Sequence, residues 1–506
     1  SRGLGDVYKR QLQMSYQHGA YGEIGNDKVK SAVQVDTVVA YIGTAPINLV
    51  LGYKEKGLIN TPIKLENMPK TQATVGYSSN WNKFTLCEPF DCHFANTIGN
   101  VGPIYIINVL DPAVHQKDVK TTVELTFKNG RAEYVTDTII LDTFALSDKV
   151  LGADYSLDYN YTKGAVVIES LNDADPITGT VEASFTEVDP SLVTKSDIIG
   201  SVTASGKRTG LQALSKLYTM FNAVLNILAA PFWSEDPDVY KAMISVVQKL
   251  NGHWDAFVNA DLPIYDSKAK AAIDTLKKAE EWADSNGYNN GFSKVYWPQV
   301  QYAGKVYHLS TQATVTMQRV DNSHDNIPME SPSNKEIMCT AQYFGANSEN
   351  EGFDQQDGNE LNSKGITTAV FWGGLWVLWG PHTAYYEYGS DGVARYIFDV
   401  NIRMLMYITN GFQRRHGTQI DSTMDLSLQQ SILIDEQEEL DSLKGRGALI
   451  GDPTVEFLET ANPTSNLMNG DFVWDISATP TPPFKSGTAR VSYTDEGFTA
   501  YFGGGE

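Results

Sequence analysis

The chain has 506 residues, of which 42% are hydrophobic and 20% charged, and its formal net charge is −22. Its length predicts two to four domains with sizeable cores, and its negative charge argues against direct contact with nucleic acid or with an anionic membrane surface. No window reaches the roughly 18 to 20 apolar residues that a bilayer span requires, so we expect no membrane insertion.

Cysteine usage indicates the compartment in which the chain folds. Cys87, Cys92 and Cys339 are too few, and odd in number, for a disulfide framework, so we expect assembly in a reducing cytoplasm. Residues 1–13 show no pattern that continues into the following sequence. We interpret them as a non-native scar and expect the native chain to start at Met14.

The next segment, residues 14–36, is polar and contains a short alternating run at 31–35. In that run Val33 and Val35 would lie on one side of a strand, but the sequence offers no adjacent strand for pairing. We therefore predict an N-terminal arm.

Residues 37–117 and 196–385 are predicted to form an α/β core domain. Apolar runs at 38–42 and 104–110 indicate buried strands, the second ended by Asp-Pro. The stretch between them contains a plausible helix at 86–96. These elements begin an α/β layer.

The same pattern resumes after residue 200. Apolar positions from 211 to 228 indicate one face of a helix, although residues 225–230 are also compatible with a strand. The Asp-Pro pair at 236–237 is typical of a helix start, here for a helix to residue 250. Residues 256–258 indicate a strand and residues 266–285 another helix. Alternating strands and helices predict a parallel or mixed sheet.

Residues 118–195 differ in character and are predicted to form an inserted, β-rich domain. Short alternating runs at 122–127, 165–168 and 180–185 indicate strands. The Asn-Gly pair at 129–130 is a strong signal for a hairpin turn.

The last part of the chain, residues 386–486, is predicted to be an α+β domain. It contains helical patterns at 393–415 and 426–443. Strand-like runs follow at 455–458, 472–476 and 488–493. Together with the preceding segments, this predicts a multidomain protein that combines α/β and α+β parts.

The third of these runs lies in residues 487–506, which we interpret as a C-terminal arm. In an extended conformation Ala489, Val491 and Tyr493 share one side, because strand side chains alternate. These three residues and Phe498 are our candidate contact residues. Both chain ends therefore offer arms that are able to form strands.

Motifs for catalysis are mostly incomplete. The stretch Gly200–Arg208 resembles a phosphate-binding loop, but five residues separate its glycines where four are needed, and an arginine replaces the metal-binding Ser or Thr. Cys87, Cys92 and His93 lack the second ligand pair of a zinc site, so buried free cysteines are the simpler interpretation. Nothing near Cys339 supports a Cys–His nucleophile.

Three further stretches have simpler structural interpretations. The oxygen-rich run 321–325 lacks the spacing of a calcium loop and is predicted to be a polar loop. The acidic run 435–439 is typical of a solvated helix face. The aromatic run 371–379 is predicted to be a helix or strand packed between domains. No active site assembles from these candidates, so we expect no catalytic residue, metal or cofactor, and no enzyme activity.

Several segments together resemble the tail sheath family of contractile phages, R-type bacteriocins and related injection systems. The segments are Asp36 to Pro46, Thr85 to Val109, Gly200 to Leu214, Asn226 to Pro231, Ser331 to Lys335 and Asn462 to Phe502. Their order and spacing over about 460 residues carry the resemblance, and the stretch 118–195 matches least. The resemblance implies that this inserted domain is an outer domain, which faces outward in the family.

The resemblance implies a sheath subunit that polymerises as stacked hexameric rings around an inner tube and contracts without ATP. It also implies that the terminal arms of neighbouring subunits complete a sheet in a third subunit. The expected partners are other copies of the chain, the tube protein, and baseplate and tail terminator proteins. The expected location is a virion tail or tail-like particle assembled in a bacterial host. The alternatives are another self-assembling structural protein, such as a capsid or surface-layer subunit, and a hydrolase.

Overall fold

The computed structural model describes residues 37–503, and an eight-stranded sheet forms its largest core. The strand order is β19-β18-β14-β11-β10-β1-β3-β2, with six parallel inner strands and an antiparallel strand at each edge. The strands are β1 (Val39–Gly43), β2 (Pro62–Leu65), β3 (Ile104–Asn108), β10 (Ile227–Ala229), β11 (Phe257–Asp261), β14 (Ser293–Tyr296), β18 (Ile366–Trp372) and β19 (Leu375–Trp379). The mixed sheet and the strands near 38–42 and 104–110 are confirmed.

Helices pack against this sheet. They are α2 (Tyr53–Lys56), α3 (Met68–Val75), α4 (Cys87–Phe94), α5 (Lys195–Ile199), α6 (Leu217–Phe221), α7 (Pro237–Val247), α8 (Leu276–Asn286), α9 (Leu309–Ser323) and α10 (Gln355–Ser363). Every residue of β1, β3 and β11 is buried, which is typical of parallel strands. As predicted, α7 starts at Asp236-Pro237, where the Asp236 carboxylate accepts a hydrogen bond from the Asp238 N–H.

Two predicted helices are shorter than expected. Helix α8 begins only at Leu276, because the Thr275 hydroxyl caps it, and residues 265–272 form the short antiparallel pair β12 (Tyr265–Asp266) and β13 (Ala271–Ala272). The apolar stretch from 211 is a 3-10 helix followed by α6. That helix ends at Asn222, whose φ of 52° reverses the chain, and the alternative strand then forms as β10.

Helix α9 is buried although many of its residues are polar. Twelve of its 15 residues are buried, among them Gln318, whose amide donates to the carbonyls of Thr37 and Pro103. The helix extends through Ser323, so the prediction of a polar loop at 321–325 is wrong for its first three residues. Asp321 is inside the protein and ion-paired instead of solvated.

The aromatic run 371–379 forms strand, one of its two predicted conformations, but three of its side chains are not packed. It forms the tip of the β18–β19 hairpin, turned by Gly373 and Gly374, both at positive φ. The side chains of Phe371, Trp372 and Leu375 are exposed. They do not pack between domains, because the two glycines turn the strands back at the sheet edge.

Residues 121–185 form two three-stranded antiparallel sheets, β4-β9-β6 and β5-β8-β7, around a separate apolar core. The strands are β4 (Thr121–Phe127), β5 (Arg131–Val135), β6 (Ala145–Leu146), β7 (Tyr155–Asn160), β8 (Ala165–Ser170) and β9 (Gly179–Phe185). The predicted turn at Asn129-Gly130 is present, but only Lys128 and Arg131 pair across it. Strands β4 and β5 then enter different sheets instead of pairing as a hairpin.

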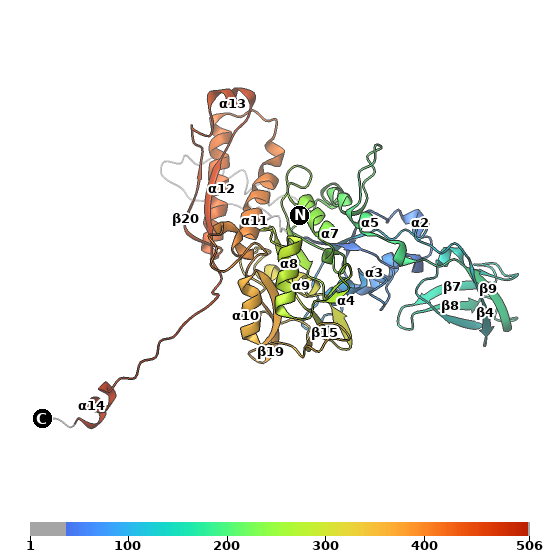
Figure 1. The fold of residues 1–506 in the computed structure, drawn as a ribbon. Coiled ribbons are helices and arrows are strands. Elements are labelled where there is room, and N and C mark those ends of the chain that lie inside the picture. The colour runs from blue at the N-terminus through green and yellow to red at the C-terminus, as the bar shows by residue number, and fades with distance from the viewer. Residues whose placement is uncertain (1–36, 504–506) are drawn as a thin grey trace, which may run out of the picture. The chain divides into compact units, whose positions relative to one another are not determined.

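After residue 398 the chain forms two long helices and a two-stranded sheet (Figure 1). The elements are α11 (Asp399–His416), α12 (Leu426–Gly445), β20 (Leu449–Glu456), α13 (Thr464–Asn469), β21 (Asp475–Pro480) and α14 (Glu496–Phe502). The two predicted helices form, although α11 begins at Asp399 and not at residue 393. The first two predicted strands form with shifted bounds, because β20 ends at Glu456 and β21 begins at Asp475. Apolar side chains of α11, α12, β20 and β21 form their own core cluster.

The predicted strand at 488–493 does not form in the single chain. Residues 482–493 make no backbone hydrogen bond to the rest of the described chain, and a strand requires a partner for its backbone groups. Phe498 lies in the helix α14.

Candidate assembly surfaces

The residues considered for catalysis do not form a reactive site. The phosphate-loop-like stretch is an exposed excursion in which Val202 pairs with Arg208, and the backbones of Gly200 and Gly210 touch at its base. Cys87, Cys92 and Cys339 are free and buried, and burial raises the pKa of each thiol. Within residues 37–503 no group of three or more His, Cys, Asp or Glu side chains is arranged to hold a metal ion.

A largely buried charge cluster, for which the sequence carries no local signal, lies at the start of α9. His308 bonds Glu88 through Nδ1 at 2.7 Å and faces Glu235 at 3.4 Å. Burial disfavours the protonated form of His308, but the Glu88 charge and the hydrogen bonds to Glu235 and Glu88 raise its pKa well above the usual value. The imidazole is therefore a structural cation that ties α9 to α4.

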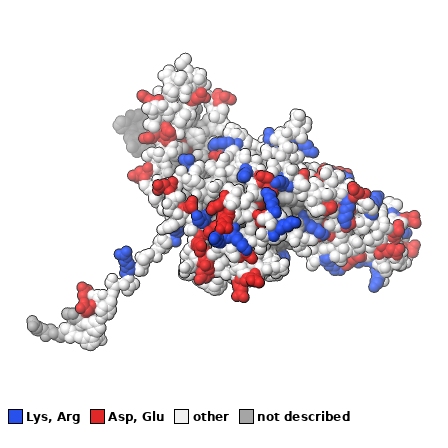
Figure 2. Space-filling view, viewed as in Figure 1, with Lys and Arg blue, Asp and Glu red and all other residues white. Residues whose placement is uncertain are grey.

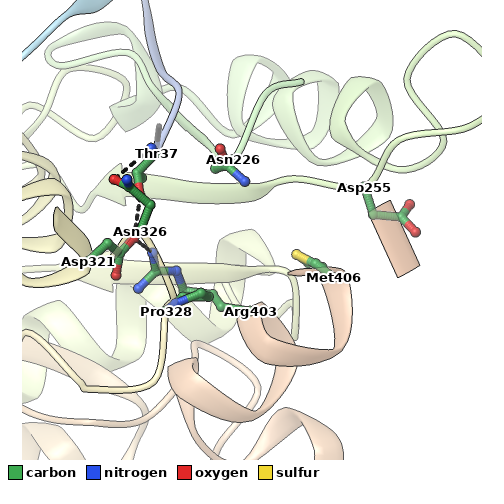
Figure 3. A pocket seen from close by; sticks show the side chains of 8 residues that line it. All are labelled: Thr37, Asn226, Asp255, Asp321, Asn326, Pro328, Arg403 and Met406. Carbon is green, nitrogen blue, oxygen red and sulfur yellow. Dashed lines mark hydrogen bonds and ion pairs between the residues drawn. The ribbon is translucent and has the colours of Figure 1, made fainter. Parts of the chain in front are cut away.

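A second cluster anchors the start of the described chain (Figure 3). The Thr37 N–H donates to Asn326 Oδ1 and the Thr37 hydroxyl to Asp321 Oδ2, both at 3.2 Å, and Asp321 pairs with Arg403 of α11. The adjoining cavity of about 20 Å³ has room for one water molecule and is too small for a substrate. These contacts fix the position of Thr37, directly before β1 of the central sheet.

The candidate residues of the C-terminal arm are exposed in the single chain. Val491 is 93% exposed, Tyr493 83% and Phe498 57%, and Ala489 is exposed as well. In the space-filling view this segment is mostly uncharged (Figure 2). Exposed apolar side chains in series are typical of an interaction surface. The N-terminal candidates, Val33 and Val35, lie outside the described residues.

The β20–β21 pair is the second candidate surface. It has two strands only, and one of its faces packs on α11 and α12. An isolated two-stranded sheet is marginally stable in water, and unpaired strand edges are templates for further strands. The pair is therefore able to accept a strand from another chain.

A buried ion cluster joins the two helices beneath this sheet. Arg415 of α11 donates two hydrogen bonds to the Glu436 carboxylate of α12, at 2.8 and 2.7 Å, and His416 Nε2 lies 2.7 Å from Glu436 Oε1. Burial alone would lower the pKa of His416 and raise that of Glu436. The hydrogen bonds to Glu436 and Gln419 and the Glu436 charge outweigh burial and raise the pKa of His416, although the Arg415 charge opposes them. The hydrogen bonds from His416 and Arg415 and their charges lower the pKa of Glu436.

This cluster predicts a pH window for the α11–α12 pair. The stability that His416 contributes to the folded helix pair is complete below its usual pKa of 6.5 and is lost as pH rises through its raised pKa. The stability that Glu436 contributes is complete above its usual pKa of 4.5 and is lost as pH falls through its lowered pKa. We expect hydrogen-exchange protection of α12 amides to be greatest between pH 4.5 and 6.5. Glu436→Gln should remove this dependence and destabilise the helix pair by about 2 to 3 kcal/mol, because Arg415 retains some solvent.

The exposed Glu438 on the same helix supplies the control. Glu438→Gln should leave both the protection and its pH profile unchanged, because Glu438 makes no ion pair within residues 37–503. An unchanged profile in Glu436→Gln would contradict the assignment.

No protein-family model matches the chain, but its sequence and its fold are similar to those of other proteins, among them the following three. A tail sheath protein of Burkholderia phage BcepMu is 27% identical over 97% of this chain and 100% of that protein. A putative prophage major tail sheath protein of Pseudomonas aeruginosa is 26% identical over 60% of this chain and 74% of that protein. The sheath complex of the extracellular contractile injection system PVC, in its contracted state, has a similar fold, with a TM-score of 0.54, 11% identity and coverage of 96% of this chain and 99% of that one.

Of the helices formed by residues 37–503, none combines the length and hydrophobicity that crossing a bilayer requires.

Proposed function

The chain belongs to the contractile tail sheath family, and from that premise we propose that it is the sheath subunit of a contractile phage tail or tail-like injection particle. Its role is mechanical and non-enzymatic. It polymerises as stacked hexameric rings around an inner tube, and contraction of the polymer drives the tube through a target envelope. Baseplate and tail terminator proteins lie at the two ends of the polymer. The particle assembles in the bacterial host cytoplasm.

One observation carries this proposal. The chain combines a two-stranded sheet, β20–β21, with a C-terminal segment whose residues 482–493 have no backbone hydrogen-bond partner elsewhere within residues 37–503. Strand addition between copies gives the sheet a further strand and gives the C-terminal segment a hydrogen-bond partner. Main-chain hydrogen bonds then provide the affinity, and the alternating side chains determine the register.

The arms link each subunit to different neighbours. We assign Ala489, Val491, Tyr493 and Phe498 to the C-terminal arm, and Val33 and Val35 to the N-terminal arm. Such head-to-tail contacts are heterologous, so they close into rings or propagate as helices. A stack of rings requires both ring closure within a layer and helical propagation between layers.

Contraction follows as a rigid-body change of packing between subunits that the arms keep joined. The free energy is stored in the metastable extended polymer and is released from one end, so ATP is not required. This fits the incomplete phosphate-loop motif at Gly200–Arg208.

The first test is self-assembly of the purified full-length protein. We expect negative-stain electron microscopy to show ribbed tubes of constant diameter, because the arms carry the information for both ring closure and stacking. A flat lattice, closed shells or monodisperse monomers would contradict the proposal, and the first two would indicate a different structural protein.

A further inference from the structure

The two edges of the β20–β21 sheet are not equivalent. On β20 the Val455 N–H donates to Gln437 Oε1 at 3.3 Å, and the Pro453 carbonyl accepts from Gln437 Nε2 at 3.1 Å. The side chain of Gln437, from α12, thus occupies backbone groups that a new strand would need. Pro453 also lacks an N–H, and the strand register shifts between Ile450 and Thr454.

The free edge of β21 is open by comparison. Within residues 37–503 no side chain bonds the backbone of residues 475–480, and the strand has no bulge of its own. Ile476 and Ala478 pack toward α11 and α12, whereas Ser477 and Thr479 are exposed. An incoming strand on this edge therefore meets one apolar and one polar face.

This edge also carries an unbalanced charge. Glu456 and Asp475 are directly opposite each other across the sheet, and neither forms an ion pair within residues 37–503. The Asp475 Oδ2 atom is shielded from solvent and has no hydrogen-bond partner among those residues. Like charges in opposite positions destabilise a strand pair, so the site lacks a cation.

The C-terminal arm carries a cation at a matching place. Arg490 is exposed and makes no hydrogen bond or ion pair within the described residues. It lies between Ala489 and Val491, so in a strand its side chain points to the face opposite theirs.

Matching the faces gives a register. In an antiparallel pair, directly opposite residues share a face. If Val491 lies opposite Ile476, then Ala489 lies opposite Ala478, and the apolar faces coincide. Arg490 then lies opposite Ser477 and diagonal to Asp475, about 7 to 8 Å away between backbones, which an arginine side chain spans.

The antiparallel direction would also place α14 next to an aromatic cluster of the neighbouring copy. The chain after Tyr493 would run toward the aromatic side chains of Phe457, Phe472 and Trp474, which lie within 6.5 Å of one another by ring centroid. Phe498 and Phe502 stack on each other on one side of α14, and both are exposed. The reverse direction would carry α14 to the Pro480 end, away from these rings.

We propose that the C-terminal segment of a second copy of this chain pairs antiparallel with β21, with Arg490 on Asp475 and α14 on the aromatic cluster Phe457, Phe472 and Trp474. This inference rests on the proposed function, because it assumes that the arm adds a strand to a neighbour. It specifies the edge, the direction and the ionic contact of that addition.

A charge swap tests the ionic contact. We expect Arg490→Glu and Asp475→Lys each to lower the yield of sheath tubes about tenfold or more, because each variant places like charges together at the interface. The double variant should recover most of the wild-type yield. Lys485→Glu, which changes the other cation of the same segment, should have little effect, because Lys485 precedes the strand and lies near Tyr386.

The outcomes separate this inference from the proposed function. If the double variant stays defective while deletion of 487–506 abolishes tubes, the arm is required and the Arg490–Asp475 contact is wrong. If the deletion leaves tubes intact, the strand-addition model itself fails.

Cysteine pairs test the direction. Thr488→Cys with Thr479→Cys places two thiols opposite each other in the antiparallel register, and we expect covalent multimers on non-reducing gels after oxidation of tubes. Thr494→Cys with Thr479→Cys matches the reverse direction and should give monomers. Multimers from the second pair alone would overturn the proposed direction.

Discussion

Deletion of residues 487–506 is expected to abolish polymerisation while leaving the monomer folded. The removed residues that the structure describes are almost all exposed, and residues 482–493 make no backbone hydrogen bond to the rest of the described chain, so the core loses little. The polymer loses the strand that we place on β21 of a neighbour, together with all its main-chain hydrogen bonds. Size-exclusion chromatography and electron microscopy should show folded monomers and no tubes.

Two further truncations complete this experiment. Deletion of residues 14–35 should have the same effect if the N-terminal arm carries Val33 and Val35 into a neighbouring sheet. Removal of only residues 504–506 is the matched control and should leave tubes intact, because it spares all four assigned C-terminal contact residues. Tubes of normal length from both arm deletions would contradict the arm model.

The sequence predicted the elements in which local pattern and tertiary environment agree. Strands β1 and β3 are continuous apolar runs because they are buried in a parallel sheet. Helix α7 has both a capping Asp and Pro237 in its first turn. At such positions a single chain segment contains all the residues whose pattern specifies the element.

Other elements were missed because their signal lies elsewhere in the chain. Helix α9 has no clear apolar period, since polar residues such as Gln318 are satisfied by distant carbonyls. The turn at Asn129-Gly130 was predicted, but which strand pairs with β4 depends on β9, more than 50 residues later.

The candidate assembly site shows the same division. Alternation at 488–493 is the basis for the prediction of a strand there; no strand forms within the described chain, and the exposure of Val491 and Tyr493 fits a partner in another copy. The occupied edge of β20 was not predictable, because it depends on Gln437, a residue of another element.

The second large effect is expected at the buried pair Lys294–Asp399. Both side chains have 0% exposure, and the Lys294 ammonium lies 2.5 Å from Asp399 Oδ2, which also accepts from the Ser331 hydroxyl at 3.0 Å. Burial lowers the pKa of Lys294, and the Asp399 charge opposes that effect. The pair joins strand β14 of the central sheet to the first turn of α11.

Asp399→Asn keeps the shape of the side chain but removes the charge that balances Lys294. An uncompensated buried charge typically costs about 3 to 5 kcal/mol. We therefore expect the unfolding midpoint to fall by on the order of 10 °C in a calorimetric scan. Glu387→Gln, which breaks the more exposed pair Lys364–Glu387, is the matched control and should change the midpoint little.

The double variant Lys294→Met with Asp399→Asn identifies the cause. Removing both charges leaves no unpaired ion, so most of the lost stability should return, as is usual when a buried ion pair is replaced by uncharged side chains. If the double variant were as unstable as Asp399→Asn, packing and not charge would explain the loss. Helix α11 leads to β20 and β21, so a weakened Lys294–Asp399 pair should also reduce the force that a polymer transmits from its arms to the central sheet. We therefore expect tubes of Asp399→Asn to break at lower temperature than tubes of Glu387→Gln.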